Sequence, residues 1–179
     1  MFTIPNVLTL LRIVCTPWVA VLLSRGDYRL AFPLLMAVGL TDALDGFLAR
    51  RFHWESRLGA YLDPAADKFM LAAVYLSFLL SGALPAWLPA LVLLRDVGIL
   101  LFVGLIVWRT RIRSFPPSAW GKISTFYQIG FAALVVLDRY SPGTVAQPLL
   151  AMLMAATAAA TAWSGIDYLR IGIRMMKAV

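Results

Sequence analysis

Cysteine, histidine and charged residues are all scarce in this sequence. Its 179 residues include one cysteine and one histidine, and only 14% of them are charged. A lone cysteine excludes a disulfide-stabilised secreted domain, and soluble domains carry about 25% charged residues. The hydrophobic share of 61% is more than a chain of this length can bury in one aqueous core. The composition therefore excludes a soluble enzyme and a disordered chain, and it predicts an integral membrane protein.

Acidic residues are the scarcer of the two signs of charge. The sequence has 9 Asp and Glu against 16 Lys and Arg, which gives a net charge of +7. Because the basic residues are spread over separate loops and form no single stripe, the charge does not indicate a nucleic-acid partner. In a membrane protein, such residues contact anionic lipid headgroups. We therefore expect anionic membrane lipids, and no nucleic acid, among the partners.

Long hydrophobic runs are abundant. A membrane-spanning helix needs about 20 largely apolar residues, and charged, Gly-containing or Pro-containing segments separate such runs here. The runs that meet this requirement lie at about 7–24, 31–51, 60–81, 86–108, 118–137 and 146–169. No linker or internal repeat divides them, so we expect a single domain over 1–179. The predicted fold is an all-α polytopic membrane protein with six transmembrane helices.

The basic residues at the ends of these runs predict the orientation of the chain. Most of them gather on one side, at Arg12, in the loops around 50–57 and 109–113, and in the tail after 169. The other side holds fewer: Arg25, Arg29 and Arg139. By the positive-inside rule, both termini lie in the cytoplasm.

Most of the acidic residues fall inside or at the edge of the predicted membrane helices. An ionised carboxylate there costs at least about 2.5–3.5 kcal/mol on insertion scales, so it normally has a partner and a role. Ion pairs account for two of these residues, because Asp96 adjoins Arg95 and Asp167 can reach Arg170 one turn on. They do not account for the remaining four, which are Asp42, Asp45, Asp63 and Asp67.

These four aspartates are spaced to converge. Asp42 and Asp45 are three residues apart near the cytoplasmic end of one run, and Asp63 and Asp67 are four apart near the start of the next. Each pair lies on one helix face, and the short connection makes the two helices antiparallel neighbours. Repulsion prevents four clustered carboxylates from staying ionised unless cations lie between them. Hard oxygen ligands favour Mg²⁺, Mn²⁺ or Ca²⁺, and two-metal sites serve phosphoryl chemistry.

Small residues accompany the acids. Gly46 and Ala49 leave helix surface bare one turn from the first pair, and Gly59 does the same at the start of the next helix. A bulky flat group could approach the backbone there, and Arg50 could bind a phosphate with its fork of donors. Tight packing between helices is the alternative explanation of the small residues.

Together these residues form one continuous pattern. From Asp42 to Asp67 the chain reads Asp-x2-Asp-Gly-x2-Ala-Arg-x8-Gly-x3-Asp-x3-Asp. The pattern resembles the signature of the CDP-alcohol phosphatidyltransferase family at every defined position. The resemblance implies a six-helix membrane protein with an N-terminal interfacial segment, commonly a homodimer. It also implies a place in the bacterial inner membrane, with the active site on the cytoplasmic side.

The resemblance further implies roles for individual residues. The residues implied to bind two divalent cations, Mg²⁺ or Mn²⁺, which hold the diphosphate of CDP-diacylglycerol, are Asp42, Asp45, Asp63 and Asp67. Those implied to line the pocket for the CDP moiety are Asp45, Gly46, Ala49, Arg50 and Gly59. Asp67 would also be the general base that takes the proton from the acceptor hydroxyl as CMP leaves.

The acceptor alcohol divides the family members that the chain resembles. Residues 39–42 and the Arg95–Asp96 pair are similar to the cardiolipin synthases, whose acceptor is phosphatidylglycerol. The alternative is a likeness to phosphatidylglycerophosphate synthases, whose acceptor is glycerol 3-phosphate. Both acceptors carry a phosphate, and the basic residues that we expect to bind it are Lys122, Arg95 and Arg109.

An ion or lipid transporter is the alternative from a different class, because acids inside a membrane also mark ion paths. Transporters place such groups near the midplane of the bilayer and often show inverted repeats. Here the acids gather near one face and the sequence contains no repeat, so an enzyme is favoured.

Overall fold

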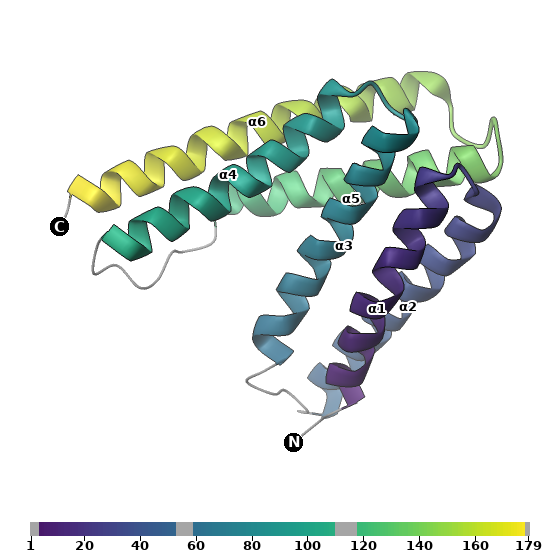
Figure 1. The fold of residues 1–179 in the computed structure, drawn as a ribbon, viewed down its shortest axis with the longest axis horizontal. Coiled ribbons are helices and arrows are strands. Elements are labelled where there is room, and N and C mark those ends of the chain that lie inside the picture. The colour runs from purple at the N-terminus through teal and green to yellow at the C-terminus, as the bar shows by residue number, and fades with distance from the viewer. Residues whose placement is uncertain (1–3, 53–58, 110–117, 178–179) are drawn as a thin grey trace. The chain divides into compact units, whose positions relative to one another are not determined.

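The computed structural model describes residues 4–52, 59–109 and 118–177, and over these ranges the chain forms helices and no strand. Side chains are not described at 4–7, 42–52, 59–62 and 177. The helices are α1 (Ile4–Ser24), α2 (Tyr28–Phe52), α3 (Gly59–Ser81), α4 (Trp87–Arg109), α5 (Ala119–Tyr140) and α6 (Gln147–Lys177) (Figure 1). The expected all-α fold is therefore confirmed.

Each helix covers one of the predicted hydrophobic runs. Residues 4–6, which precede the first predicted span, already belong to α1, and α6 continues beyond the predicted end at 169 to Lys177. Three of the turns between helices contain a glycine with a positive φ: Gly26 at 73°, Gly82 at 66° and Gly143 at 85°. A side chain with a Cβ is strained in this conformation, so these glycines allow the chain to leave one helix and turn into the next.

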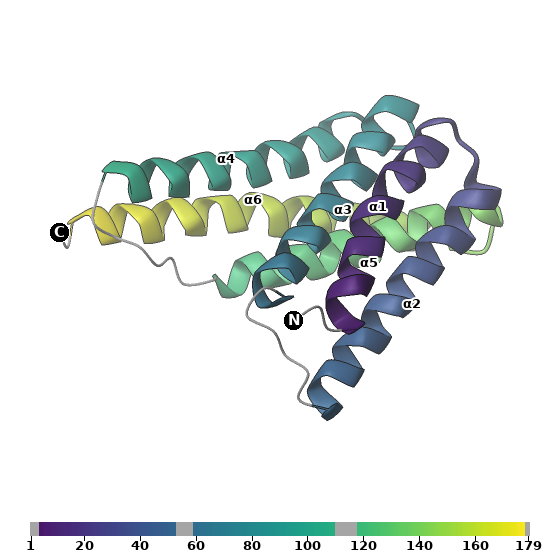
Figure 2. The same cartoon turned by 60° about the horizontal axis from the view of Figure 1, so that its bottom comes forward.

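The helices pack as two compact units. Met1–Ala83 contains α1, α2 and α3, and Leu84–Val179 contains α4, α5 and α6. In the first unit α1 packs against both α2 and α3, and in the second α6 packs against both α4 and α5 (Figures 1 and 2). Within its own unit, α1 or α6 is therefore the helix that contacts both of the others. The single domain over 1–179 stays a prediction.

The second unit has a polar seam between α5 and α6. The Gln128 side-chain amide donates to Thr161 Oγ1 at 2.9 Å and to Ser124 Oγ at 3.1 Å, and all three residues are fully buried. Thr157 Oγ1 donates to the backbone carbonyl of Tyr127 at 3.4 Å. In lipid such bonds must be made within the protein, so the seam holds α5 against α6.

The apolar surface of the helices is typical of a chain surrounded by lipid. Among the residues whose side chains are described, four helical stretches are long and apolar enough to cross a membrane: Asp63–Ser81, Trp87–Arg109, Ala119–Tyr140 and Gln147–Met176. The parts of α1 and α2 whose side chains are described form shorter apolar helices, Leu8–Ser24 and Tyr28–Thr41. Large side chains such as Leu94 (72% exposed) and Phe126 (76% exposed) face outward. The chain is a polytopic membrane protein.

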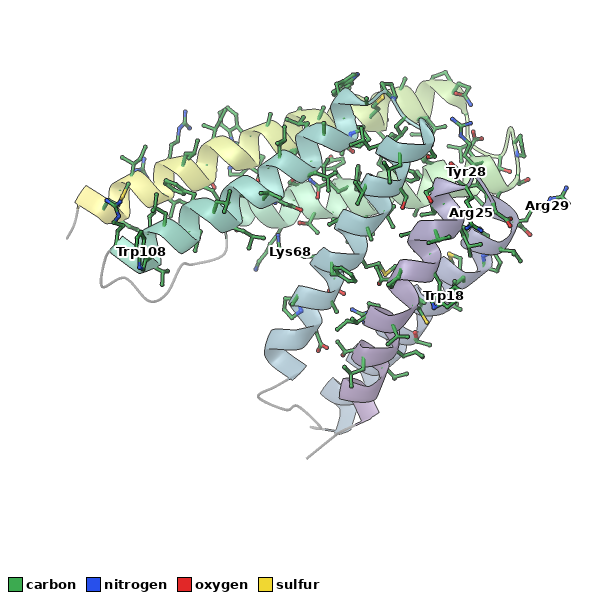
Figure 3. The ribbon with its side chains drawn as sticks, in the orientation of Figure 1. Trp18, Arg25, Tyr28, Arg29, Lys68 and Trp108 are labelled. Carbon is green, nitrogen blue, oxygen red and sulfur yellow. The ribbon has the colours of Figure 1, made fainter. Side chains whose placement is uncertain are left out.

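Charged and aromatic side chains lie at the helix ends. Arg25, Tyr28 and Arg29 lie together around the turn between α1 and α2, and Trp108 lies at the end of α4 (Figure 3). The Arg109 guanidinium stacks on the Trp108 ring at 5.5 Å. Aromatic and basic residues of this kind anchor helix ends at the membrane interface.

Candidate metal and substrate site

The first unit brings two acids of α3 against two donors of α1. Thr9 Oγ1 donates a hydrogen bond to Asp63 Oδ1. Arg12 Nη1 donates to Asp67 Oδ1 and forms an ion pair with it. The donors are three residues apart on α1 and the acids are four apart on α3, so each pair occupies one face of its helix.

Three side-chain hydrogen bonds between the described parts of α1 and α3 join residues whose numbers increase together along both helices. They join Thr9 to Asp63, Arg12 to Asp67, and the backbone carbonyl of Ala20 to Ser77 Oγ at 3.0 Å. The helices α1 and α3 therefore run parallel, as expected when one helix connects them. Both acids lie near the end of the unit at which α1 and α3 begin.

A buried stripe on α1 explains why it meets α3 in this register. The buried residues of α1 recur at spacings of three and four: Thr9, Arg12, Thr16, Val19 and Leu23. This spacing is that of one helix face. On α3 the corresponding buried residues are Ala66, Leu71, Val74, Tyr75, Ser77 and Phe78. Apolar packing over the later turns thus brings the polar first turns of the two helices together.

Burial differs sharply across the two contacts. Thr9 is 0% and Arg12 is 3% exposed, whereas the Asp67 side chain is 52% exposed. Asp63 is intermediate between these extremes. The donors are therefore enclosed between the helices, while the Asp67 carboxylate remains accessible to a cation or a substrate.

The other signature residues fall on the neighbouring helix ends. Asp42, Asp45, Gly46, Ala49 and Arg50 all belong to the last turns of α2, and Gly59 is the first residue of α3. Their side chains lie outside the described part of the chain. The predicted convergence of four carboxylates, and the predicted CDP pocket, therefore stay predictions.

In the second unit, Arg95 is a buried charge at the centre of a polar cluster. Its guanidinium donates to Asp96 Oδ1 and to Ser164 Oγ, and it lies 5.6 Å from the Tyr168 ring centre. The predicted ion pair between Arg95 and Asp96 is confirmed. The predicted pairing of Asp167 is wrong, because Asp167 accepts a hydrogen bond from Ser118 Oγ. Its expected partner Arg170 stacks on Trp163 at 5.4 Å instead.

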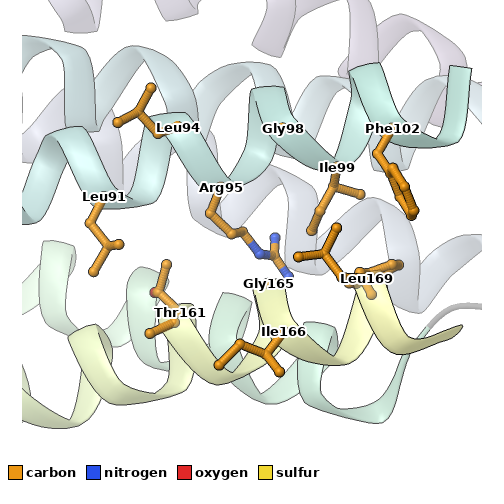
Figure 4. Close-up of a pocket in the computed structure, with 12 residues that line it drawn as sticks. Leu91, Leu94, Arg95, Gly98, Ile99, Phe102, Thr161, Gly165, Ile166 and Leu169 are labelled. Carbon is orange, nitrogen blue, oxygen red and sulfur yellow. The ribbon is translucent and has the colours of Figure 1, made fainter. Parts of the chain in front are cut away.

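Arg95 also borders a cavity between α4 and α6. The cavity has a volume of about 380 Å³, and its other walls are mostly apolar, from Leu94, Phe102 and Leu169 among others. Arg95 extends from α4 toward Gly165 of α6 (Figure 4). Its Nε is buried and has no hydrogen-bond partner among the described residues.

The three basic residues predicted to bind the acceptor phosphate lie in different settings. Arg95 is 8% exposed, while Lys122 on α5 and Arg109 at the end of α4 are exposed. Arg95 and Arg109 are fourteen residues apart on one helix, or about 21 Å along its axis. The two residues therefore lie about four turns apart along α4, one buried and the other exposed.

Sequence reasoning missed the role of α1 at this site. It used Arg12 to orient the chain in the membrane and assigned nothing to Thr9. The available signal was the stripe of Thr9, Arg12 and Thr16 on one face of an otherwise apolar helix. A buried polar side chain normally has a hydrogen-bond partner, and for Thr9 and Arg12 the structure places a partner on α3.

Comparison with known proteins agrees with these features. Residues 2–163, which span both units, match the family described as CDP-alcohol phosphatidyltransferase. A probable cardiolipin synthase (CMP-forming) of Drosophila melanogaster is 40% identical over 116 residues, which are 64% of this chain and 35% of that protein. The chain thus spans about a third of that relative's length.

Two mycobacterial proteins match over more of the chain. A probable phosphatidylglycerophosphate synthase of Mycobacterium tuberculosis is 32% identical over 176 residues, which cover 94% of this chain and 81% of that protein. The crystal structure of phosphatidylinositol phosphate synthase from M. tuberculosis, in complex with manganese and citrate, has the same fold, with a TM-score of 0.62 and 20% identity. The match covers 94% of this chain and 81% of that one. The chain belongs to the CDP-alcohol phosphatidyltransferase family, and with it to the phosphatidyltransferase enzymes rather than to the transporters.

Proposed function

We propose that this protein transfers the phosphatidyl group of CDP-diacylglycerol to the hydroxyl of a glycerol-based acceptor, with release of CMP. The observation that carries the proposal is the pair Asp63 and Asp67 on one face of α3. Donors of α1 hold both acids from one side, and the Asp67 carboxylate is half exposed. The complete family signature runs through the same residues.

Two divalent cations, Mg²⁺ or Mn²⁺, fit this arrangement. Carboxylate oxygens are the ligands that these ions prefer, and the Asp67 side chain remains 52% exposed although Arg12 pairs with one of its oxygens. We propose that the ions are held by Asp42, Asp45, Asp63 and Asp67. When bound, they would neutralise charge on the diphosphate and on the leaving CMP.

The end of α2 would bind the nucleotide. Asp45, Gly46 and Ala49 follow one another within about one turn of α2, so a flat ring could lie against nearly bare backbone. Arg50 adds a fork of donors for a phosphate or ribose oxygen. Gly59 would contribute a second bare surface at the start of α3.

The chemical step assigned to Asp67 is removal of a proton. The acceptor oxygen attacks the phosphorus of the phosphatidyl group, and the bond from that phosphorus to the oxygen of CMP breaks. The proton of the attacking hydroxyl passes to the Asp67 carboxylate. The protein otherwise aligns the two substrates and stabilises charge.

We propose phosphatidylglycerol as the acceptor, which makes the protein a cardiolipin synthase. The similarity to the Drosophila relative supports this choice, and the mycobacterial relative supports the alternative acceptor, glycerol 3-phosphate. Lys122 is the proposed contact for the acceptor phosphate, because it is exposed. Arg109 and Arg95 are alternatives, and the Asp96 and Ser164 bonds of Arg95 already occupy much of its guanidinium.

The proposed setting is the cytoplasmic side of a bacterial inner membrane, where the protein would act as a homodimer among anionic lipids. The clustering of basic residues toward one side of the sequence supports this orientation. Labelling of cysteines introduced at the exposed positions Arg25 and Thr144 should succeed only from outside the cell. Labelling of both positions from the cytoplasm would contradict the orientation.

The function is tested by CMP release from CDP-diacylglycerol in detergent–lipid micelles with Mn²⁺. The wild type should release CMP when an acceptor is present, and EDTA should stop the reaction. Asp63→Ala should lose activity, whereas Asp138→Ala, in the last turn of α5, should keep it. CMP release that survives EDTA or Asp63→Ala would contradict the proposed site.

A further inference from the structure

We propose that Thr9 and Arg12 of α1 are positioning residues for the metal-binding and proton-accepting carboxylates. Each makes a side-chain contact with one acid of α3: Thr9 with Asp63, and Arg12 with Asp67. This inference rests on the proposed function, because it concerns the same two acids. It assigns to α1, which carries none of the signature residues, the task of orienting them.

The geometry favours orientation over simple neutralisation. Both donors contact the Oδ1 atom of their acid, and no donor to either Oδ2 occurs among the described residues. Because Thr9 and Arg12 are almost completely buried, their positions are determined by packing between α1 and α3. A donor fixed in this way restricts the rotation of the carboxylate, so that its second oxygen points in one direction.

The charge of Arg12 suits this task. A guanidinium keeps its proton at every physiological pH, so its charge remains beside Asp67 whether or not a metal is bound. Burying such a charge is costly without an anionic partner, and Asp67 supplies that partner. The contact also offsets repulsion between Asp67 and Asp63, which are only one turn apart.

A purely structural role, joining α1 to α3, is the alternative. Other contacts already join these helices along the same face. Ser77 Oγ donates to the Ala20 carbonyl at 3.0 Å, and Val19 and Leu23 lie in the shared apolar core with Phe78. The two helices therefore do not depend on the Thr9 and Arg12 contacts for their association.

Thr9→Val tests the inference, because valine has the shape of threonine but cannot donate a hydrogen bond. Thr16→Val is the matched control: Thr16 is 1% exposed on the same stripe, and its hydroxyl donates only within α1, to the Arg12 carbonyl at 2.8 Å. Mn²⁺ affinity is measured without substrate by electron paramagnetic resonance. The Mn²⁺ concentration for half-maximal CMP release is measured separately.

Loss of an outer-shell partner typically lowers metal affinity about 10–100-fold. Thr9→Val should therefore weaken Mn²⁺ binding at least about 10-fold, Thr9→Ser should restore it, and Thr16→Val should leave it unchanged. For Arg12, the uncharged Arg12→Gln should lower kcat at saturating Mn²⁺, and Arg12→Lys should recover part of the loss.

Equal Mn²⁺ affinity in Thr9→Val and the wild type would overturn the positioning role. So would equal weakening in Thr9→Val and Thr16→Val, since that result indicates a structural effect. A wild type that binds Mn²⁺ in a Thr9-dependent manner but releases no CMP would overturn the proposed function and leave the positioning role supported. The two failures are therefore distinguishable.

Discussion

Replacing Asp67 by asparagine separates its proposed role as a base from its role in the fold. Asparagine has the same size and keeps an oxygen that can accept the hydrogen bond from Arg12. It cannot take a proton from the acceptor hydroxyl. General-base catalysis contributes about 10²–10⁴-fold in rate, or about 3–5 kcal/mol of the barrier. Asp67→Asn should lose at least about 100-fold in kcat.

The effect on stability should be much smaller. An exposed ion pair contributes at most about 1 kcal/mol, and breaking a buried pair costs about 3 kcal/mol or more. The pair of Asp67 and Arg12 lies between these limits, because its side chains are 52% and 3% exposed. The variant should therefore unfold a few degrees earlier than the wild type and remain folded at assay temperature.

The assay follows CMP release per folded protein, with thermal unfolding and Mn²⁺ binding measured on the same samples. Asp138→Asn is the matched control, because Asp138 accepts hydrogen bonds from Gly143 and Val145 in the turn after α5, far along the chain from the signature. Residual activity of Asp67→Asn above about a tenth of the wild-type rate is more than loss of a general base allows. That result would reduce Asp67 to a metal ligand at most.

Three further predictions concern the second unit. Gly121→Ala should lower the free energy of unfolding by about 1–3 kcal/mol, because the new Cβ would lie 2.9 Å from the Tyr168 ring. Gly130→Ala on the same helix is the control and should leave stability unchanged, because its Cβ would meet nothing within 4 Å. Thermal unfolding measures both variants, and equal midpoints would contradict the close packing of Gly121 against Tyr168. Lys122→Ala should raise KM for the acceptor several-fold and leave KM for CDP-diacylglycerol unchanged, as measured by CMP release. Equal changes in the two KM values would show that Lys122 does not recognise the acceptor. Arg95→Met should destabilise the protein by about 1–3 kcal/mol, since it removes the hydrogen bonds that the buried guanidinium donates to Asp96 and Ser164; an unchanged unfolding midpoint would show that these bonds contribute nothing.

Sequence periodicity predicted the helices well because each apolar run ends at a physical signal. Charged segments and the glycines at 26, 82 and 143 interrupt the runs, and the helices end there. The extension of α6 to Lys177 was not predictable from apolarity, because its last turns carry Arg170 and Arg174. A helix can continue past the lipid where its polar side chains reach water.

Partners between distant helices were harder to predict. The pairing of Asp96 with Arg95 is local and was predicted correctly, whereas Asp167 accepts a hydrogen bond from Ser118, the residue that caps the start of α5, and not from Arg170 of its own helix. The contacts of Thr9 and Arg12 depend on the register of α1 against α3, and the packing of buried side chains along the whole face sets that register. Spacing within one helix shows which residues share a face, but not what covers that face.

The most direct test of the central claim is the identity of the lipid product. Purified protein is incubated in micelles with Mn²⁺ and CDP-diacylglycerol. Deuterated phosphatidylglycerol is added to one sample and deuterated glycerol 3-phosphate to another, and the lipid products are identified by mass spectrometry. Phosphatidyl transfer to phosphatidylglycerol alone, giving deuterated cardiolipin with one CMP per product, is the expected result. Deuterated phosphatidylglycerophosphate alone would replace the proposed acceptor with glycerol 3-phosphate. CMP release with no phosphatidylated acceptor in either tube, or no CMP release at all, would contradict transfer to a glycerol-based acceptor.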